Sequence, residues 1–404
     1  MRDPTSRGGR RLRAWLSLSH ILDPVSVPTE VLLLCWRDTG HPQGGGSERY
    51  LERVGAALAA RGVRVTLLTA AYPGAPRKQM HGGMRVLRTG GRLTVYPRVL
   101  LMLLGARLGV GRLARYRPDV VVDTQNGVPF FATLVARAPT VVLVHHCHRE
   151  QWPVAGPVLA RIGWFVESWL SPRVHRRSRY ITVSRPSADE LVALGVDGGR
   201  ISVVRGGIDP VPAGVADDET EGRRHRLIVV SRLVPHKQVE HALAVVARLR
   251  DRGLDVHLDV VGDGWWSPEL LSRTDDLGLS DRVEFHGYVD ERTKHQLLAR
   301  ADLHLLPSRK EGWGLAVIEA AQHGVPTLGY RSSAGLTDSI VDGRTGVLVD
   351  DPAQLTEAVA ALIDDPAQVR RLGENARRRA AGYSWSDTAD RFGEVLSAAA
   401  AGRG

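Results

Sequence analysis

The chain has 404 residues, of which 43% are hydrophobic and 24% charged. This composition indicates a globular protein with room for two separate cores, and it excludes a wholly disordered chain, a collagen and a disulfide scaffold. The net charge is +10, but 50 of the 54 basic residues are arginines spread along the whole chain, which is more typical of a coding bias than of nucleic-acid binding. The four lysines are Lys78, Lys237, Lys294 and Lys310.

The N-terminal 28 residues are rich in Arg, Ser, Pro and Gly, and we expect a disordered or loosely docked tail. The apolar stretch from Ala14 to Leu22 is short and lacks a small-residue cleavage site, so no signal peptide is expected. No apolar run reaches the roughly 18 to 20 residues that a membrane-spanning helix needs. Cys35 and Cys147 follow or lie within apolar runs and are expected to be buried thiols. These features together predict a cytoplasmic protein.

From Val31 onward, short apolar runs alternate with longer helix-compatible stretches, which predicts parallel sheets built from βαβ units. The runs are nearly continuous in apolar residues, as expected for strands covered by helices on both faces. In the first half the predicted strands are Val31–Trp36, Val63–Thr69, Met84–Leu87, Asp119–Asp123, Thr140–His146, Tyr180–Ser184 and Ile201–Val204.

A polar stretch from Asp209 to Arg224 interrupts the alternation, and we place the domain boundary there. The second half is predicted to form a second doubly wound sheet. Its predicted strands are Leu227–Val230, Val256–Val261, Val283–His286, Leu303–Leu306, Pro326–Tyr330 and Gly346–Val349. The chain then divides into a tail (1–28), an N-terminal Rossmann-like domain (29–212), a C-terminal one (213–382) and a terminal segment (383–404). Two such domains in tandem predict a ligand cleft between the carboxyl edges of both sheets.

Two predicted strand ends carry groups suited to a phosphate. Gly44, Gly45 and Gly46 lie after the first strand and open a helix, where backbone amides and the helix N-terminus favour an anion; a merely flexible loop is about as consistent with this motif. Arg232 and Lys237 leave the first strand of the second half, and together they would neutralise a diphosphate. Lysine is scarce in this chain, so its use at Lys237 favours a specific role over a solvated surface charge.

The segment from Pro307 to Ala321 follows another predicted strand and is the most informative motif. Glu311 is expected on a loop at the carboxyl edge, and Glu319 in the early turns of an apolar, alanine-rich helix. A buried carboxylate is costly unless it receives hydrogen bonds, which sugar or ribose hydroxyls would supply. The alternative is that Glu319 caps backbone amides or pairs with an arginine.

A cluster from His145 to Glu150 ends a strand of the first half. Neighbouring residues on a strand point to opposite faces and no second pair of ligands is present, so we do not expect zinc or another metal. A histidine at this strand end would instead donate to a sugar hydroxyl or a phosphate.

Taken together, these motifs resemble the retaining glycosyltransferases of family four, which have the two-domain GT-B fold. The resemblance runs from Val31 to the C-terminus and also includes the family's closing loop. It rests on Gly45–Glu48, Ser231–Lys237, Val261–Gly264, Phe285–Val289, the pair Glu311 and Glu319, and Gly343–Gly346.

The resemblance implies a role for each motif residue. Gly45, Gly46, Arg232 and Lys237 would hold the donor diphosphate, and Glu319 the ribose hydroxyls. The transferred sugar would be held by Glu311 and by the backbone of Gly312, Trp313, Gly314 and Leu315. Val289 would lie against the nucleobase, and His145 would lie near the donor sugar, with His146 as a competing assignment. The stretch from Tyr383 to Ala400 resembles the terminal helix that crosses back onto the first domain.

The sequence also departs from the family pattern. Arg205 stands before Gly206 where the family usually has Asn, and Asp338 stands where it usually has Glu. The family's double glycine is here Ala334 and Gly335. Because Arg232, Lys237, Glu311 and Glu319 are all retained, an active enzyme is the favoured interpretation.

The resemblance implies front-face transfer of a hexose with retention of configuration, without cofactor or metal, in which Arg232 and Lys237 stabilise the departing diphosphate. The partners would be a nucleotide-sugar donor and an acceptor that is a glycan, a lipid-linked molecule or a small metabolite, but no nucleic acid. The alternatives are a catalytically silent sugar-nucleotide-binding protein, a sugar-nucleotide epimerase or an inverting transferase of the same fold. Peripheral membrane contact at the inner face is a further hypothesis, based on Leu100–Leu113 and on Trp152, Trp164 and Trp169.

Overall fold

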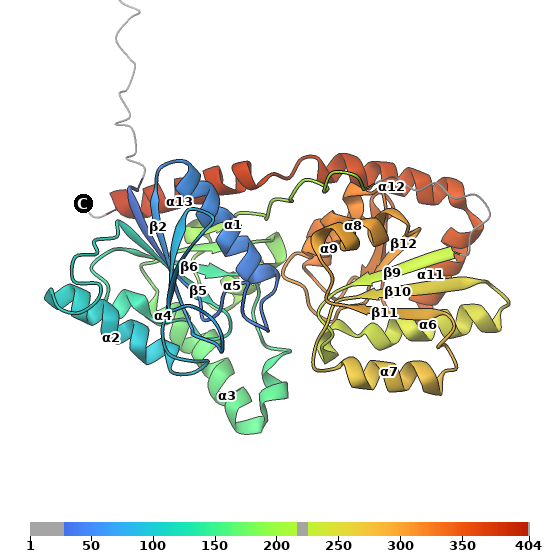
Figure 1. Ribbon diagram of the computed structural model, residues 1–404, viewed down its shortest axis with the longest axis horizontal. Helices are drawn as coiled ribbons and strands as arrows, with labels where there is room; N and C mark the ends of the chain where they lie inside the picture. Colours follow the sequence, from blue (N-terminus) through green and yellow to red (C-terminus); the bar gives the residue numbers. More distant parts are fainter. Residues whose placement is uncertain (1–27, 216–224, 403–404) are drawn as a thin grey trace, which may run out of the picture.

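The computed structural model describes residues 28–215 and 225–402. The predicted tail therefore lies outside the described residues except for Pro28, as does the 216–224 part of the predicted boundary. Within these ranges the chain forms two parallel sheets with helices on both faces, arranged side by side (Figure 1). None of the helices in the described ranges is both long and apolar enough to cross a bilayer.

The first sheet has eight strands in the order β3-β4-β2-β1-β5-β6-β7-β8. Every predicted strand of the first half is present, and the central strands β1 and β5 are almost fully buried because helices cover both faces. The bounds are β1 Glu30–Leu34, β2 Arg64–Thr69, β3 Lys78–His81, β4 Met84–Arg88, β5 Val120–Gln125, β6 Thr140–Val144, β7 Arg179–Thr182 and β8 Ile201–Val203.

Two details of this sheet differ from the prediction. Strand β6 ends at Val144, so His145 and His146 lie on the loop that follows it. The edge strand β3 was not predicted, because its sequence is polar and largely exposed. It pairs antiparallel with β4 through a turn at Gly82 and Gly83, whose φ angles of +54° and +77° suit a tight hairpin.

Helices pack on both faces of the first sheet. On one face α1 packs on Leu33 through its Val54. On the other face α2 packs on Leu32 and Leu34 through its Val99. The helices are α1 Gly46–Ala60, α2 Val95–Leu108, α3 Pro157–Phe165, α4 Ser171–Val174 and α5 Arg185–Ala193. A π-helical stretch, Val166–Leu170, joins α3 to α4, and short 3-10 turns are Ala132–Leu134, Trp152–Ala155, Gly198–Arg200 and Pro235–Lys237.

The second sheet has six parallel strands in the order β11-β10-β9-β12-β13-β14, all of them predicted. The strands are β9 His225–Val230, β10 Val256–Val261, β11 Val283–Gly287, β12 Leu303–Leu306, β13 Thr327–Tyr330 and β14 Gly346–Val349. The helices are α6 Val239–Asp251, α7 Ser267–Asp276, α8 Glu291–Ala299, α9 Leu315–Gln322, α10 Leu336–Ser339, α11 Pro352–Asp364 and α12 Pro366–Ala380. In both sheets the strand order reverses direction at the centre, which is the doubly wound arrangement.

The C-terminal helix α13, Trp385–Ala401, leaves the second sheet and packs on the first (Figure 1). Its Phe392 and Leu396 join the same core as Leu33. Arg61 of α1 forms an ion pair with Asp390 at 2.9 Å. This helix therefore links the two halves on the side of the first sheet that α1 covers.

Candidate active site

The predicted site residues lie where strand order reverses in each sheet. The loop after β1 leads to Gly45, the loop after β9 carries Arg232 and Lys237, and the loop after β12 carries Glu311. His145 follows the end of β6. Because the strands are parallel, these loops leave the carboxyl edges of both sheets, where doubly wound proteins bind ligands.

The glycine loop is organised by Glu48, one helical turn into α1. The backbone N–H of Gly45 donates to Glu48 Oε2 at 2.8 Å, and Arg37 Nε donates to Glu48 Oε1 at 2.8 Å. Burial alone would raise the pKa of Glu48, but Arg37 outweighs it and the pKa lies below its ordinary value. Glu48 is therefore an ionised, buried anchor that holds the loop in one conformation.

The glycine loop lies against the second half of the chain. A methyl group at Gly45 would lie 3.5 Å from Arg232 Nε, which is ordinary contact, and one at Gly46 would lie 3.3 Å from Leu315 Cδ1, which is slightly tight. Both neighbours belong to the second half of the chain.

Arg232 is partly buried, and its guanidinium makes no hydrogen bond or ion pair within residues 28–215 and 225–402. Burial and the nearby Arg37 lower its pKa, although Glu48 and Glu311 oppose that effect. A guanidinium without an ion-pair partner beside the second cation Arg37 is unfavourable in free energy. An anion bound next to Gly45 and Arg232 would relieve this unfavourable charge.

Lys237 and Glu311 form a close ion pair between the loops after β9 and β12. Lys237 Nζ lies 2.5 Å from Glu311 Oε1, and both side chains are mostly buried. Burial would raise the pKa of Glu311, but the charge and hydrogen bond of Lys237 hold it below its ordinary value. The pair thus fixes an ammonium and a carboxylate side by side at the same sheet edge as Arg232.

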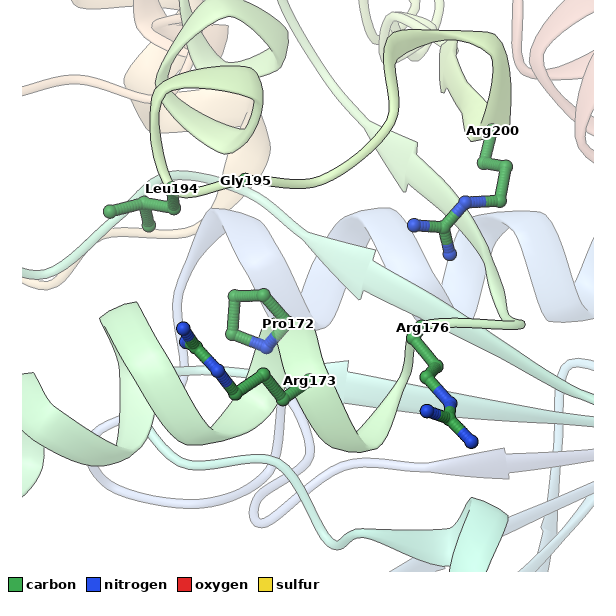
Figure 2. A pocket seen from close by; sticks show the side chains of 6 residues that line it. All are labelled: Pro172, Arg173, Arg176, Leu194, Gly195 and Arg200. Atoms are coloured by element: carbon green, nitrogen blue, oxygen red, sulfur yellow. The ribbon is translucent and has the colours of Figure 1, made fainter.

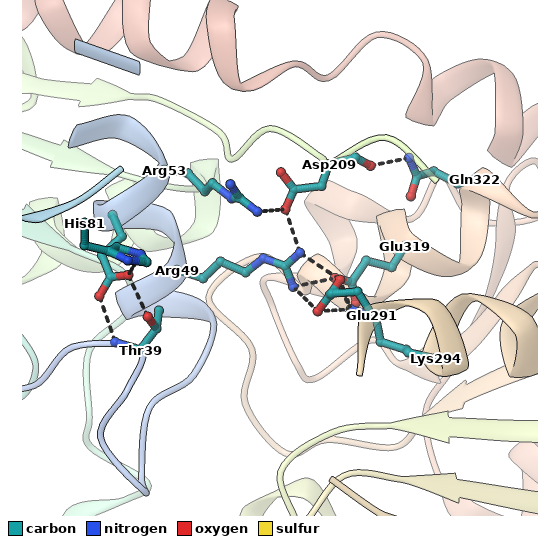
Figure 3. A network of polar contacts seen from close by, with 10 residues as sticks. Thr39, Arg49, Arg53, His81, Asp209, Glu291, Lys294, Glu319 and Gln322 are labelled. Carbon is teal, nitrogen blue, oxygen red and sulfur yellow. Dashed lines mark hydrogen bonds and ion pairs between the residues drawn. The ribbon is translucent and has the colours of Figure 1, made fainter. Parts of the chain in front are cut away.

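Glu319 belongs to a network that joins the two halves of the chain (Figure 3). Its Oε1 accepts from Lys294 Nζ at 2.9 Å and lies 3.4 Å from Arg49 Nη1 of α1. Arg49 also contacts Glu291 at 2.9 Å and Asp209 at 2.6 Å. Glu319 therefore pairs with an arginine, as the alternative interpretation of the sequence predicted, although a lysine is its closer partner.

The loop from Gly312 to Leu315 packs against the end of β6. A methyl group at Gly312 would lie 2.7 Å from the carbonyl oxygen of His145, so only glycine fits there. Burial lowers the pKa of His145 to about 4, and its Nε2 is buried without a hydrogen bond in the described structure. His145 is therefore neutral near pH 7, with its ring edge-on to Tyr50 at 5.2 Å.

The remaining residues predicted to bind the donor are Trp313, Gly314, Leu315 and Val289. Gly314 has a φ of +87° and precedes α9, which Leu315 begins. The Trp313 side chain is buried against Tyr383, so its backbone is the part available to a ligand. Val289 packs in a separate apolar cluster of the second sheet.

Two of the three departures from the family pattern contact each other. Arg205 Nε and Nη2 donate to the two carboxylate oxygens of Asp338, both at 2.8 Å. Arg205 follows β8 and Asp338 lies on α10, so this forked pair also spans the two halves. The sequence alone did not reveal that these two residues are partners.

Sequence reasoning missed Arg49, Asp209, Glu291, Lys294 and the ion pair between Lys310 and Glu190. One signal would have found part of this set. Of the four lysines in the chain, three pair with carboxylates where the two halves meet: Lys237, Lys294 and Lys310. The rarity that drew attention to Lys237 applied equally to the other two.

One group of potential metal ligands occurs in the described ranges, and it lies on the second sheet, away from these loops. His257, Asp259 and Glu284 offer ligand atoms within 4.8 Å of one another. Asp259 already accepts from Arg226 at 3.0 Å and from His286 at 2.8 Å, and its pKa is lowered to about 2 even though burial alone would raise it. The carboxylate is thus satisfied by protein donors.

Comparison with known proteins identifies the family. Residues 44–211 match the family described as Glycosyltransferase Family 4, and residues 216–379 match Glycosyl transferases group 1. Glycogen synthase of Mycobacterium tuberculosis is 30% identical over 386 residues, covering 89% of this chain and 92% of that protein. A GDP-mannose-dependent alpha-(1-6)-phosphatidylinositol monomannoside mannosyltransferase of Mycolicibacterium smegmatis is 28% identical, covering 88% and 96%.

Solved structures agree on the fold. Sucrose-phosphate synthase from Thermosynechococcus elongatus has a TM-score of 0.74 at 20% identity, covering 91% of this chain and 98% of that one. Anabaena HepE in complex with UDP-glucose has a TM-score of 0.69 at 18% identity, covering 91% and 99%. The predicted GT-B fold is thereby confirmed, and the chain belongs to glycosyltransferase family 4.

Proposed function

We propose that this family 4 glycosyltransferase moves a hexose from a nucleotide-diphosphate sugar to an acceptor hydroxyl, with retention of anomeric configuration and without a metal ion. The observation that carries the proposal is the partly buried Arg232, whose guanidinium lacks an anionic partner within the described residues and lies beside Gly45. A diphosphate there would supply the missing negative charge and accept from the guanidinium fork.

Lys237 supplies the second cation. Its ion pair with Glu311 holds the ammonium in place before any donor arrives, so little reorganisation is needed when charge develops on the leaving diphosphate. Glu311 and the backbone of Gly312 to Leu315 then face the transferred sugar. We assign the catalytic role to His145, Arg232, Lys237 and Glu311 as a group.

Glu319 would bind the ribose hydroxyls, with Val289 against the nucleobase. For this, Glu319 has to share its carboxylate with Lys294 and Arg49 or exchange one of them for the ribose. Two lone pairs on each carboxylate oxygen make sharing chemically feasible. The network therefore links occupancy of the ribose site to the contact between the two domains.

In the proposed reaction the bond between the anomeric carbon and the diphosphate oxygen breaks, and a bond to the acceptor oxygen forms on the same face. The acceptor proton passes to an oxygen of the departing diphosphate. His145, neutral and with a free buried Nε2, would donate a hydrogen bond to a hydroxyl of the donor sugar. Arg232 and Lys237 stabilise the charge that the diphosphate gains.

A thermal-shift screen with UDP-, GDP-, ADP- and TDP-sugars identifies the donor, because a ligand that binds only the folded state raises the melting temperature. Turnover with that donor is then followed by release of the nucleoside diphosphate in the presence and absence of a chelator. Proton coupling at the anomeric carbon of the product reports its configuration. We expect retention and unchanged activity with the chelator.

Other outcomes separate the alternatives. Binding without turnover for any acceptor class would indicate a silent sugar-nucleotide-binding protein. Conversion of the donor into another sugar nucleotide without acceptor would indicate an epimerase. An inverted product would contradict the front-face reaction.

A further inference from the structure

Helix α2 presents aliphatic side chains to solvent. Its inner side packs on the first sheet through Val95, Val99 and Leu103. On its outer side Leu101 and Leu108 are 66% and 69% exposed, which is unusual for two leucines on one helix of a folded domain. No described segment covers them.

Helix α3 and the π-helical turn after it present a second apolar row. Val158, Ile162, Phe165 and Trp169 are spaced three or four residues apart and are between 45% and 66% exposed. The rings of Phe165 and Trp169 stack at 5.0 Å, and the Arg173 guanidinium lies 4.2 Å from the Trp169 ring centre. Aromatic rings beside arginine are typical of residues that anchor a protein at a membrane interface.

The two rows lie on one face of the first sheet. Val121 of β5 packs under α2, and Val142 of β6 packs under Trp164 of α3. In the β5–β6 register Val121 pairs with Thr140, so Val121 and Val142 point to the same side. Both helices lie along the lower side of this domain in Figure 1, opposite α13. We call their outward side the α2–α3 face.

Exposed arginines surround this face. On α2 and directly after it, Arg98, Arg107, Arg112 and Arg115 are exposed and make no ion pair within the described residues. Near α3 the exposed Arg161 and Arg176 have no side-chain partner within the described residues. The acid in this part, Glu167, is buried and accepts from Trp152 Nε1 at 2.7 Å. The face therefore combines apolar side chains with uncompensated positive charge.

A cavity of about 510 Å³ opens beside this face (Figure 2). It lies between the end of α4 and the end of α5, at the sheet edge opposite the proposed donor site. Arg173, Arg176 and Arg200 line it, together with Leu194. Arg200 is tethered by donation to the Ser178 carbonyl at 2.9 Å and lies 3.8 Å from Asp197, whereas the Arg176 guanidinium has no partner in the part of the chain that the structure describes. Such a cavity suits a phosphate group.

We propose that the α2–α3 face docks on the surface of a phospholipid bilayer that contains anionic lipids. The aliphatic and aromatic rows would enter the boundary between headgroups and acyl chains, and the surrounding arginines would contact lipid phosphates. Charge complementarity selects this occupant: exposed leucines, Phe165 and Trp169, flanked by exposed arginines that make no ion pair within the described residues, match an anionic lipid surface. The inference concerns a surface remote from the proposed donor site and stands independently of the proposed function.

The test is co-sedimentation of the full chain with vesicles of phosphatidylcholine, alone or mixed with phosphatidylglycerol. We expect binding to the mixed vesicles that weakens as salt rises, and little binding to phosphatidylcholine alone. Ile162→Asp and Phe165→Asp should each lower the partition coefficient about tenfold or more. Arg161→Gln and Arg176→Gln should each lower it about fivefold.

A matched control is Leu271→Asp, which places the same charge at a leucine that is 48% exposed on α7 of the other domain. It should bind vesicles like the unmodified chain, and circular dichroism should show all variants folded. The proposal is overturned by absence of binding, by equal binding to both vesicle types, or by variants that bind as the control does. Self-association without lipid that Phe165→Asp abolishes would also overturn it, because the face would then be a protein interface.

Discussion

The basic residues where the two domains meet differ from those of the α2–α3 face in the partners they have. At the domain junction, Lys237 and Lys294 are mostly buried and each lies within 3.0 Å of a carboxylate. On the α2–α3 face, Arg161 and Arg176 are exposed and unpaired within the described residues. A buried charge has to be compensated inside the protein, whereas an exposed one is solvated and remains available to an external anion.

Arg232 does not follow this division. It is partly buried like the junction lysines, but within the described residues its guanidinium is unpaired like the surface arginines. A partly buried charge without an internal counterion indicates a binding site in which the ligand supplies the opposite charge. The contrast between Lys237, which is paired, and Arg232, which is not, gives the two largest predictions.

Lys237→Ala should lower kcat/KM by about two orders of magnitude or more, because one preorganised charge at the leaving diphosphate is lost. It should also lower the melting temperature, because Glu311 is left buried without its partner. Lys237→Arg should restore activity only in part, since a planar fork does not replace a compact ammonium. Lys78→Ala, on the exposed edge strand β3, is the matched control and should change neither quantity. Full activity in Lys237→Ala would contradict the proposed reaction.

Arg232→Met should reduce kcat/KM to a similar degree, about a hundredfold, but with the opposite effect on stability. Removal of a partly buried guanidinium next to Arg37 relieves an unfavourable charge, so the ligand-free variant should melt at a higher temperature than the unmodified chain. Steady-state kinetics and thermal unfolding measure the two effects. A lower melting temperature would mean that Arg232 makes a stabilising contact within the protein.

Glu319→Gln should weaken binding of the nucleoside diphosphate by about tenfold, because the ribose hydroxyls lose a charged acceptor. It should also destabilise the ligand-free protein modestly, since Lys294 keeps Glu291 as its partner but loses Glu319. Isothermal titration with the diphosphate found in the screen measures the affinity. Unchanged affinity would remove Glu319 from the donor site.

The forked pair of Arg205 and Asp338 should contribute about 1 kcal/mol of coupling in a double-mutant cycle with Arg205→Ala and Asp338→Ala. The Arg205 side chain is about one third exposed, so solvent screens part of the interaction. Chemical denaturation of the four proteins gives the coupling. Additive effects would show that the two departures are independent of each other.

The last prediction concerns pH. The pKa of His145 in the folded protein is about 4, below its ordinary value of 6.5, because the ring is buried. As pH falls, the unfolded chain therefore binds a proton at His145 before the folded chain does, and stability is lost from about pH 6.5 to about pH 4. His145→Asn should show a smaller loss over that interval in denaturation experiments at several pH values. An identical pH dependence would mean that folding does not lower the pKa of His145.

Sequence analysis alone predicted the strands well, because each is a short apolar run whose burial is dictated by local composition. It also put the glycine loop, Arg232, Lys237 and Glu311 at strand ends, since parallel sheets send all their carboxyl ends to one edge. It missed β3, whose polar residues carry no such signal and whose pairing is set by the turn at Gly82 and Gly83.

What only the tertiary structure decided is which charged residues meet. Arg205 and Asp338 are 133 positions apart, and Arg49 and Glu319 are 270 apart, so nothing local connects them. The same holds for the α2–α3 face, which exists because β5 and β6 orient Val121 and Val142 to one side. Local sequence determines which residues are apolar and where strands end, because these depend on composition and periodicity. Partners across a domain junction depend on how the two sheets are docked, and that is a property of the folded chain as a whole.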